Sequence, residues 1–440
     1  MRLSPDVFAD RRRRFLAKMG ERTAALFFAA PEAVRSNDSH FDFRQNSDFY
    51  YLTGFEEPDS ALLLLPGHDK HESVMFVRKR DKEREVWDGP RAGVEGAKGE
   101  FGANEAFLIE EVDAKLPELF EGRERLYYGL GLYADRDVQV VRALGKSRMA
   151  ERKRKRFPTE IKDPFNSALH EMRLFKTGPE LEALRRAVEI SADAHVRAMK
   201  ATKPGLGEWE IQAEVEYVFK RAGAKAPGYT TIAGSGPNAC VLHYVANQRR
   251  MGAGELLLLD AGAEVDYYTG DITRTWPVSG KFSGPQREIY DLVLKAQHEV
   301  IKIAKPGLPY ATMHETAVKV LTTGMVERGI LTGPVEKAIE DKTFRAFYMH
   351  GTGHWLGMDV HDVGAYSAEE KSRLLEPGMV FTVEPGLYFA PDATNCPERY
   401  RGIGVRIEDD ILVTATGVDV LSKGAPKDPD EIEAIVGTGV

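Results

Sequence analysis

The stretches GELLLLDAGAEV (residues 254–265) and YTGDITRTWPV (residues 268–278) each combine a strand-like apolar run with an aspartate, Asp260 in the first and Asp271 in the second. Short apolar runs bounded by Gly or Pro are typical of buried strands. Asp260 ends a run of four leucines, where a buried carboxylate costs free energy unless a positive group compensates it. The two stretches therefore predict a pair of strands whose aspartates need a positively charged partner.

A second pair of stretches, GMVFTVEPGLYF (residues 378–389) and GVRIEDDILVT (residues 404–414), repeats this pattern with Glu384 and Glu408. An acid in a single strand is more often an edge charge or an ion-pair partner than a metal ligand. Four such acids in paired strands are better explained by cation binding than by four unrelated edge charges or ion pairs.

The tetrapeptide Lys-Pro-Gly-Leu occurs at residues 203–206 and 305–308, each time between two helix-like patterns and ahead of one of these strand pairs. Four residues are few, so a chance repetition is the alternative. The simplest inference is a duplicated α+β domain in which each half donates two carboxylates to one shared centre.

The first helix of this domain has a clear start, because Thr177, Pro179 and Glu180 form a capping-box pattern with proline in the first turn. The helix must end before Pro204. His195 falls on the apolar stripe of this helix, where we expect a satisfied core histidine rather than a ligand.

The chain before about residue 175 has a different pattern. Short apolar runs such as AALFFAA (residues 24–30) and ESVMFVRK (residues 72–79) alternate with charged, helix-compatible stretches, which is typical of a mixed α/β domain. The charged, proline-containing segment 152–164 predicts a connection between domains. Because 440 residues are too many for one ordinary core, we expect an N-terminal α/β domain over residues 1–174 and a catalytic α+β domain over residues 175–440.

The composition narrows the class of protein. Two cysteines, Cys240 and Cys396, are too few for a disulfide framework. The formal charge of -8 weighs against nucleic-acid binding, although residues 152–156 (RKRKR) are basic, and we interpret that cluster as a solvated face. Neither a signal peptide nor a membrane-spanning apolar segment is predicted, so we expect a cytoplasmic protein without membrane partners.

The candidate neutral metal ligand is His354 in HGTGHWLG (residues 350–357), because its flanking glycines allow the backbone to approach the metals closely. Four carboxylates and one imidazole carry a charge that two divalent ions would offset. Oxygen-rich ligation favours manganese, with cobalt or zinc as substitutes.

Six segments resemble the metallopeptidases of the pita-bread fold, and most closely bacterial aminopeptidase P, the Xaa-Pro aminopeptidases. They are LLLLDAG, TGDITRTWPV, HGTGHWLGMDVHD, VFTVEPGLY and RGIGVRIEDD in the second domain and REVWDGPR in the first. The resemblance implies a pita-bread C-terminal domain and release of the N-terminal residue from peptides whose second residue is proline.

The resemblance also implies which residues hold two manganese ions: Asp260, Asp271, His354, Glu384 and Glu408. Asp271 and Glu408 would bridge the ions, Asp260 would chelate one, and His354 with Glu384 would complete the other. A hydroxide between the ions would be the nucleophile. Glu384 would then carry its proton toward the proline nitrogen.

Further side chains match family positions around the substrate. Proline offers no N–H, so selectivity must come from shape, while histidines can donate to the scissile carbonyl and its oxyanion. The resemblance places His243, His350 and His361 in these tasks. Arg406 lies two residues before Glu408 and so faces the same side of the strand. The remaining matches are Tyr388, as a contact for Arg406 or substrate, and Trp87, which in the family's oligomers reaches a neighbouring subunit. A core or surface-packing tryptophan is the alternative for Trp87.

Two rival functions stay open. Prolidase cleaves only dipeptides that end in proline and shares the five ligands, so the sequence does not separate it with certainty. A non-enzymatic binding module is disfavoured, because such relatives lack some ligands and this chain has all five. The resemblance suggests a homodimer or homotetramer. The ligand types favour manganese but do not fix the physiological metal among similar divalent ions, and the first-position preference and any action on phosphoesters are not predicted.

Overall fold

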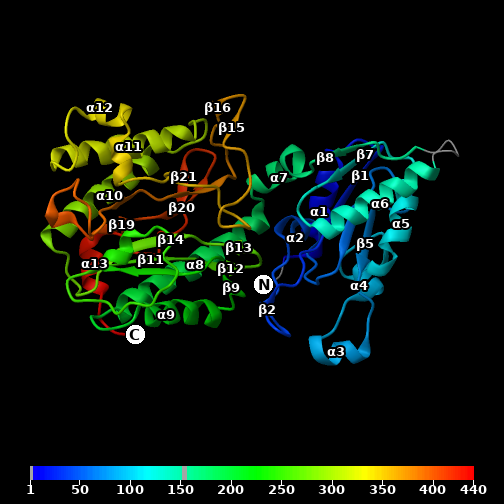
Figure 1. Cartoon of the computed structure of the whole chain (residues 1–440), viewed down its shortest axis with the longest axis horizontal. Coiled ribbons are helices and arrows are strands. Elements are labelled where there is room, and N and C mark those ends of the chain that lie inside the picture. The colour runs from blue at the N-terminus through cyan, green and yellow to red at the C-terminus, as the bar shows by residue number, and fades with distance from the viewer. Residues whose placement is uncertain (1–2, 151–155) are drawn as a thin grey trace. The chain divides into compact units, whose positions relative to one another are not determined.

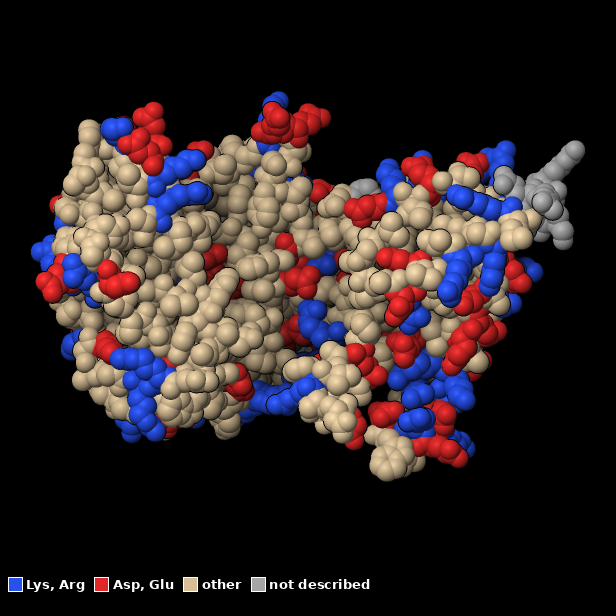
Figure 2. All heavy atoms as spheres, in the orientation of Figure 1, with Lys and Arg blue, Asp and Glu red and all other residues tan. Residues whose placement is uncertain are grey.

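The computed structural model describes residues 3–150 and 156–440 and divides into two compact units, the first ending at Met172 and the second running from Arg173 to Val440 (Figure 1). Apart from Arg156, the basic cluster at residues 152–156 lies outside the described residues. No helix in the described part is long and apolar enough to cross a membrane. Acidic and basic side chains are interspersed on the face of each unit drawn in Figure 2.

The N-terminal unit is built on a six-stranded mixed sheet in the order β6-β5-β4-β1-β7-β8. Parallel pairs join β1 to β7, β5 to β6 and β7 to β8, whereas β4 pairs antiparallel with β1 and β5. The strands are β1 (Thr23–Phe28), β4 (Ala61–Leu64), β5 (Ser73–Val77), β6 (Glu105–Leu108), β7 (Arg125–Tyr128) and β8 (Glu160–Lys162). The mixed α/β character predicted for this part is confirmed.

The same unit contains several helices and a short hairpin of β2 (Val34–Ser36) and β3 (Ser39–His40) that is not part of the six-stranded sheet. The core of the unit combines sheet residues such as Leu26, Leu63 and Phe76 with Leu116 of a helix. The helices are α1 (Pro5–Leu16), α2 (Ser47–Thr53), α3 (Lys82–Asp88), α4 (Gly93–Gly99), α5 (Val112–Leu119) and α6 (Ala134–Ala150), with α7 (His170–Leu174) at the division between the units.

The sequence predicts that residues 152–164 connect the two domains. For the described residues 156–164 this prediction is wrong, because they belong to the N-terminal unit. Residues Glu160–Lys162 form β8, the edge strand of the N-terminal sheet, which pairs in parallel with β7. All three residues are exposed. A short, charged edge strand has no buried face to give an apolar alternation, so its sequence is indistinguishable from that of a linker.

The C-terminal unit contains two helix pairs, α8 (Gly178–Ala201) with α9 (Glu208–Arg221), and α10 (Gly284–Ile303) with α11 (Ala311–Glu327). Lys-Pro-Gly-Leu joins the helices within each pair, and both its glycines, Gly205 and Gly307, have positive φ, at 90° and 83°. Two short helices, α12 (Val335–Glu340) and α13 (Pro429–Ile435), follow. The predicted capping box of α8 is present, with the Thr177 amide donating to Glu180 Oε2 at 2.9 Å.

Two three-stranded antiparallel sheets follow the helix pairs, in the orders β10-β11-β14 and β17-β20-β21. Their strands are β10 (Ile232–Ser235), β11 (Leu256–Ala261), β14 (Ile272–Pro277), β17 (Val380–Val383), β20 (Asp409–Val413) and β21 (Val418–Val420). Shorter strands flank them: β9 (Ala226–Pro227), β12 (Ala263–Val265), β13 (Tyr268–Thr269), β15 (Ser367–Ala368), β16 (Lys371–Ser372), β18 (Gly386–Tyr388) and β19 (Gly404–Arg406). Each half thus repeats the order helix, helix, strand pair, in agreement with the predicted duplication.

The two halves meet along β14 and the segment that holds β19 and β20 (Figure 1). The Glu408 amide donates to the Thr273 carbonyl at 3.0 Å, and the Thr275 hydroxyl donates to the Arg406 carbonyl at 3.0 Å. These bonds place the acid-bearing strand ends of both halves side by side.

His195 lies in the core of the unit, as expected, with no exposed surface. Its Nδ1 lies 2.8 Å from the Ser191 carbonyl oxygen, whereas Nε2 has no partner among the described residues. Burial lowers the pKa of His195 to about 4, so the ring is neutral and serves packing.

A buried ion cluster fixes the loop around Asp362. Asp362 Oδ1 accepts from Arg173 at 2.6 Å and Oδ2 accepts from Lys176 at 3.0 Å, while the Asp362 amide donates to the Trp355 carbonyl at 2.9 Å. Burial raises the pKa of Asp362, but the charges of Lys176 and Arg173 outweigh burial, and the net shift is downward. Removing one member would leave the other charges buried without compensation.

We expect Asp362→Asn to lower the free energy of unfolding by about 3–5 kcal/mol near neutral pH, measured by urea unfolding. Because the pKa of folded Asp362 is lowered, this stabilisation is complete above the unfolded value of about 3.9 and is lost as the pH falls through the folded pKa. Asp419→Asn is the control, since Asp419 pairs with Arg185 on a half-exposed surface and should contribute at most about 1 kcal/mol. Equal losses in the two variants would contradict the cluster's role.

Candidate active site

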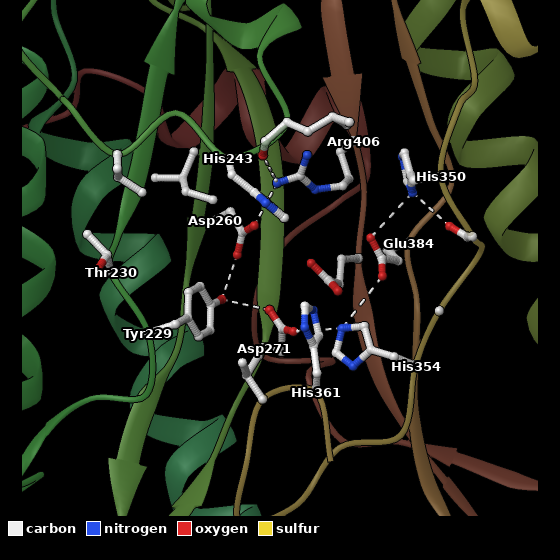
Figure 3. Close-up of a pocket in the computed structure, with 17 residues that line it drawn as sticks. Tyr229, Thr230, His243, Asp260, Asp271, His350, His354, His361, Glu384 and Arg406 are labelled. Atoms are coloured by element: carbon white, nitrogen blue, oxygen red, sulfur yellow. Dashed lines mark hydrogen bonds and ion pairs between the residues drawn. The ribbon is translucent and has the colours of Figure 1, made fainter. Parts of the chain in front are cut away.

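A cavity of about 520 Å³ lies in the C-terminal unit (Figure 3). Its wall includes apolar side chains such as Ile232, Leu242 and Val360. Most of its remaining lining is ionisable: Tyr229, His243, Asp260, Asp271, His350, His354, His361, Glu384, Arg406 and Glu408. The structure therefore brings together in one cavity nine of the eleven residues that the sequence singled out for the site.

The four acids reach the cavity from the ends of the paired strands. Asp260 is the fifth residue of β11 and Asp271 immediately precedes β14, its antiparallel neighbour. In the other half, Glu384 follows β17 and Glu408 precedes β20, again an antiparallel pair. Antiparallel pairing brings the end of one strand beside the beginning of the next, so both acids of each half lie at the same edge.

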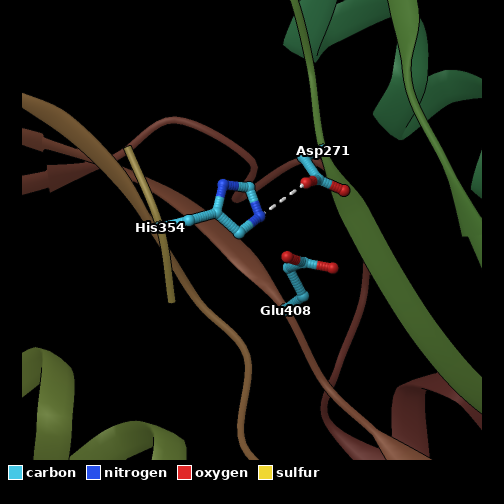
Figure 4. A group of neighbouring side chains, drawn as sticks. All are labelled: Asp271, His354 and Glu408. Carbon is cyan, nitrogen blue, oxygen red and sulfur yellow. Dashed lines mark ion pairs between the residues drawn. The ribbon is translucent and has the colours of Figure 1, made fainter. Parts of the chain in front are cut away.

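Three of the predicted ligands form a compact group (Figure 4). One ligand atom each of Asp271, His354 and Glu408 lies within 4.8 Å of the others. His354 Nε2 is 3.3 Å from Asp271 Oδ2 and 3.6 Å from Glu384 Oε1. One imidazole nitrogen thus faces a carboxylate from each half of the unit.

The glycine-flanked segment that carries His354 lies against β17. Its backbone follows the strand closely, with the His354 amide donating to the Thr382 hydroxyl at 3.1 Å and the Glu384 amide donating to the Thr352 carbonyl at 2.8 Å. A Cβ atom on Gly353 would collide with the Thr382 carbonyl oxygen. Glycine is therefore required for His354 to stand beside Glu384.

The acids carry more negative charge than their surroundings compensate. Burial raises the pKa of Asp260, raises that of Glu384 to about 7, and, together with the charge of Asp271, raises that of Glu408 well above its ordinary value. Arg406 is the one Lys or Arg side chain among the described residues that line the cavity. Its Nη2 donates to Asp260 Oδ2 at 2.6 Å, so one cation faces four carboxylates.

His354 responds to this excess of charge. Burial alone would lower its pKa, but the hydrogen bond to Asp271 and the charges of Asp271 and Glu384 raise the pKa of His354 to about 9. Divalent cations would satisfy the same acids and leave the imidazole neutral, as a ligand must be. The oxygen-rich donor set with one imidazole nitrogen therefore fits hard or borderline divalent ions.

The other predicted histidines surround this group (Figure 3). The His361 ring lies 4.4 Å from the His354 ring, and His350 Nδ1 lies 3.7 Å from Glu384 Oε2. Burial lowers the pKa of His350 to about 3, so its ring is neutral. His243 enters the cavity from a loop on the Asp260 side.

Tyr388 is not among the described residues that line the cavity, and its expected contact with substrate stays a prediction. Its side chain is buried, with 3% of the residue exposed. The hydroxyl lies 2.9 Å from His350 Nε2 and accepts from Arg406 Nη1 at 3.1 Å. Tyr388 therefore orients two residues of the cavity wall from behind, one of the two roles the sequence left open.

Trp87 belongs to the N-terminal unit, on α3, and 85% of the residue is exposed. A tryptophan with this exposure is not a core residue, so burial in a core is excluded, whereas a contact of Trp87 at a surface stays a prediction.

Nothing in the sequence indicated Tyr229, whose hydroxyl lies 2.5 Å from Asp260 Oδ1 and 2.6 Å from Asp271 Oδ1. Thr273, whose hydroxyl donates to Glu408 Oε2 at 2.6 Å, was not predicted either. Thr273 was visible in principle, because it follows Asp271 by two residues and so points to the same face. Tyr229 gave no such signal, since it precedes its strand and contacts the acids only through the fold.

A separate α/β unit joined to a duplicated α+β unit, with four carboxylates and a histidine converging in one cavity, defines a metallopeptidase architecture. The chain belongs to metallopeptidase family M24, whose model matches residues 182–415, and the aminopeptidase P N-terminal domain matches residues 8–127. The resemblance inferred from the sequence, including the pita-bread class of the C-terminal domain, is confirmed.

Relatives cover nearly the whole chain. The Xaa-Pro aminopeptidase of Escherichia coli (strain K12) is 47% identical over 99% of this chain and 98% of its own, and human Xaa-Pro aminopeptidase 3 is 34% identical over 94% and 81%. Aminopeptidase PepP of Pseudomonas aeruginosa superposes with a TM-score of 0.97 at 46% identity, covering 99% and 98% of the two chains. A variant of Escherichia coli aminopeptidase P in complex with substrate gives 0.95 at 46% identity with the same coverage.

We expect Tyr229→Phe to weaken divalent-metal binding by about 10- to 100-fold, because the variant removes the hydroxyl that orients both aspartates while keeping the ring. Titration of metal-free protein with Mn²⁺ in a calorimeter measures the change. Tyr217→Phe, an exposed tyrosine on α9, is the matched control and should bind as the parent does. Unchanged affinity in Tyr229→Phe would show that the hydroxyl does not support the ligands.

Proposed function

We propose that this protein releases the N-terminal residue from peptides whose second residue is proline, with two divalent ions in the cavity. The observation that carries the proposal is the convergence of ligand atoms from both halves of the C-terminal unit on one point. The similarity to Xaa-Pro aminopeptidases over almost the full length of the chain supports the substrate class. The proposed ligands are Asp260, Asp271, His354, Glu384 and Glu408.

Asp271 and Glu408 are the proposed shared ligands, because each comes from a different half and both lie in the compact group with His354. Asp260 and Asp271 share the Tyr229 hydroxyl as a hydrogen-bond partner, and Asp260 would serve one ion. His354 and Glu384, whose nearest nitrogen and oxygen are 3.6 Å apart, would serve the other.

Divalent ions bound here would bring the pKa of a coordinated water near neutrality and polarise the scissile carbonyl. The protein's own groups then handle the proton and the developing charge. Glu384 would carry a proton on its carboxylate toward the proline nitrogen. His243 and His361 can donate ring N–H groups to the carbonyl oxygen as it becomes an oxyanion.

Arg406 is the proposed group for orienting the substrate. It is bound by Asp260 on one side and Tyr388 on the other, while its Nε donates to the Thr273 hydroxyl at 3.1 Å. His350 shares Tyr388 with it. Proline offers no N–H to recognise, so the apolar wall formed by side chains such as Ile232 and Val360 supports selection by shape.

Manganese is the proposed physiological metal, with cobalt and zinc as substitutes. Four carboxylates and a single imidazole are ligands that suit manganese, and availability in the cell decides among similar ions. A zinc-substituted Escherichia coli aminopeptidase P has been solved in complex with product, so a related site accepts zinc.

Three further proposals follow the family resemblance. A homodimer or homotetramer is proposed, in which exposed Trp87 would approach a neighbouring subunit; light scattering that finds only monomers would contradict this.

Cys240 and Cys396 are both unpaired, which supports a cytoplasmic location, and recovery of the protein outside that compartment would contradict it. The net charge of -8 supports peptides rather than nucleic acids as partners.

We expect metal-stripped protein to release free arginine from Arg-Pro-Pro after reconstitution with Mn²⁺, and more slowly after reconstitution with Zn²⁺. The arginine is separated by chromatography and quantified over time. Arg-Ala-Ala is the control peptide, and it should be a much poorer substrate because it does not fill the shape-selected proline site.

A prolidase would behave differently in the same assay. It would hydrolyse the dipeptide Arg-Pro and leave Arg-Pro-Pro intact. That outcome would replace the aminopeptidase proposal with the dipeptidase, whereas equal cleavage of Arg-Ala-Ala would remove the specificity for proline.

A further inference from the structure

We propose that Glu208, which does not line the cavity, is a positioning residue that holds the loop carrying His243 in its active arrangement. The loop, residues 236–249, is called the His243 loop. This inference rests on the proposed function, in which His243 donates to the reacting carbonyl.

His243 has no hydrogen-bond partner for its ring among the described residues, and the side chain is exposed to the cavity. The loop contains only one short 3-10 turn, Gly236–Cys240, and is otherwise irregular. The carbonyl oxygen of Leu242, the residue before His243, accepts from Arg406 Nη2 at 3.5 Å. The direction of the His243 ring therefore depends on how the loop itself is held.

Both carboxylate oxygens of Glu208 accept hydrogen bonds that fix the loop. Oε1 accepts from the Ser235 amide at 2.8 Å, the Ser235 hydroxyl at 2.8 Å and Asn238 Nδ2 at 3.1 Å. Oε2 accepts from the Tyr244 hydroxyl at 2.9 Å and the Arg249 amide at 2.8 Å. Ser235 directly before the loop, Arg249 at its end, and Tyr244, the neighbour of His243, thus all donate to one carboxylate.

The negative charge of Glu208 suits this task. The residue is 0% exposed, and a buried carboxylate is stable only when its lone pairs are filled. Five donors fill them, and hydrogen bonds to an ionised acceptor are about twice as strong as neutral ones. A glutamine has one acceptor oxygen and an NH₂ group, so it would leave the Arg249 amide facing a donor.

A role for Glu208 in starting α9 does not explain these contacts. Glu208 is the first residue of the helix, where an acid is favourable. However, the amide at that helix end is already satisfied by Glu210, whose Oε2 accepts from the Gly207 amide at 2.7 Å. The side-chain bonds of Glu208 all go to residues 235–249 instead.

The test is a double-mutant cycle with Arg-Pro-Pro as substrate. We expect Glu208→Gln to lower kcat/KM by about 10- to 100-fold, mainly through kcat, because a small displacement of a catalytic group costs this much. In a His243→Ala background, Glu208→Gln should change kcat/KM by less than about two-fold, since its effect passes through His243. In a His361→Ala background it should keep its full effect.

Hydrogen exchange supplies a readout that does not depend on activity. Glu208→Gln should speed amide exchange in residues 236–249 and leave residues 354–364 as in the parent. Glu214→Gln is the matched control, because Glu214 lies on the same helix and pairs with Arg197 rather than with the loop. It should alter neither exchange nor kinetics.

Two results would overturn the proposal: full additivity of Glu208→Gln with His243→Ala, or unchanged exchange in the loop. General destabilisation is separated from positioning, because it would reduce activity equally in the His243→Ala and His361→Ala backgrounds. Failure of the parent to release arginine would refute the proposed function, and the exchange measurement would still decide whether Glu208 holds the loop.

Discussion

The uncompensated charge of four buried carboxylates is the constraint on which the C-terminal unit depends. Each acid stands at or near the end of a strand, and Arg406, the one Lys or Arg among the described residues that line the cavity, donates a hydrogen bond to Asp260. Burial raises the pKa of Asp260, Glu384 and Glu408 in consequence. Such a cluster is costly on its own and becomes favourable when divalent ions occupy it.

The duplicated fold is a direct way to build this cluster. Each half contributes an antiparallel strand pair, and each pair places two acids at one edge. The bonds between β14 and the segment around Glu408 then join the two edges. Around them, neutral donors such as Tyr229 and Thr273 fix the carboxylates without adding positive charge.

Much of this site could be predicted from the sequence, because strand-like runs with embedded acids and a glycine-flanked histidine are local signals. Roles that arise only from packing were not visible. Tyr229 is 31 and 42 residues from the aspartates it contacts, and Glu208 is 41 residues from Arg249. The burial of Tyr388 and the pairing of the short strand β8 likewise depend on distant segments. Which metal ion is bound depends on its availability in the cell as well as on the ligand types, so the sequence does not determine it.

The most direct test of the charge-compensation account measures metal content and prolyl-peptide cleavage together in folded Asp271→Ala and Glu408→Ala variants. If divalent ions compensate the acids, the parent binds two of them per chain, both variants lose tight binding, and kcat/KM falls by roughly a thousand-fold or more, about 4 kcal/mol. Variants that keep their fold and cleave prolyl peptides as fast as the parent would contradict it.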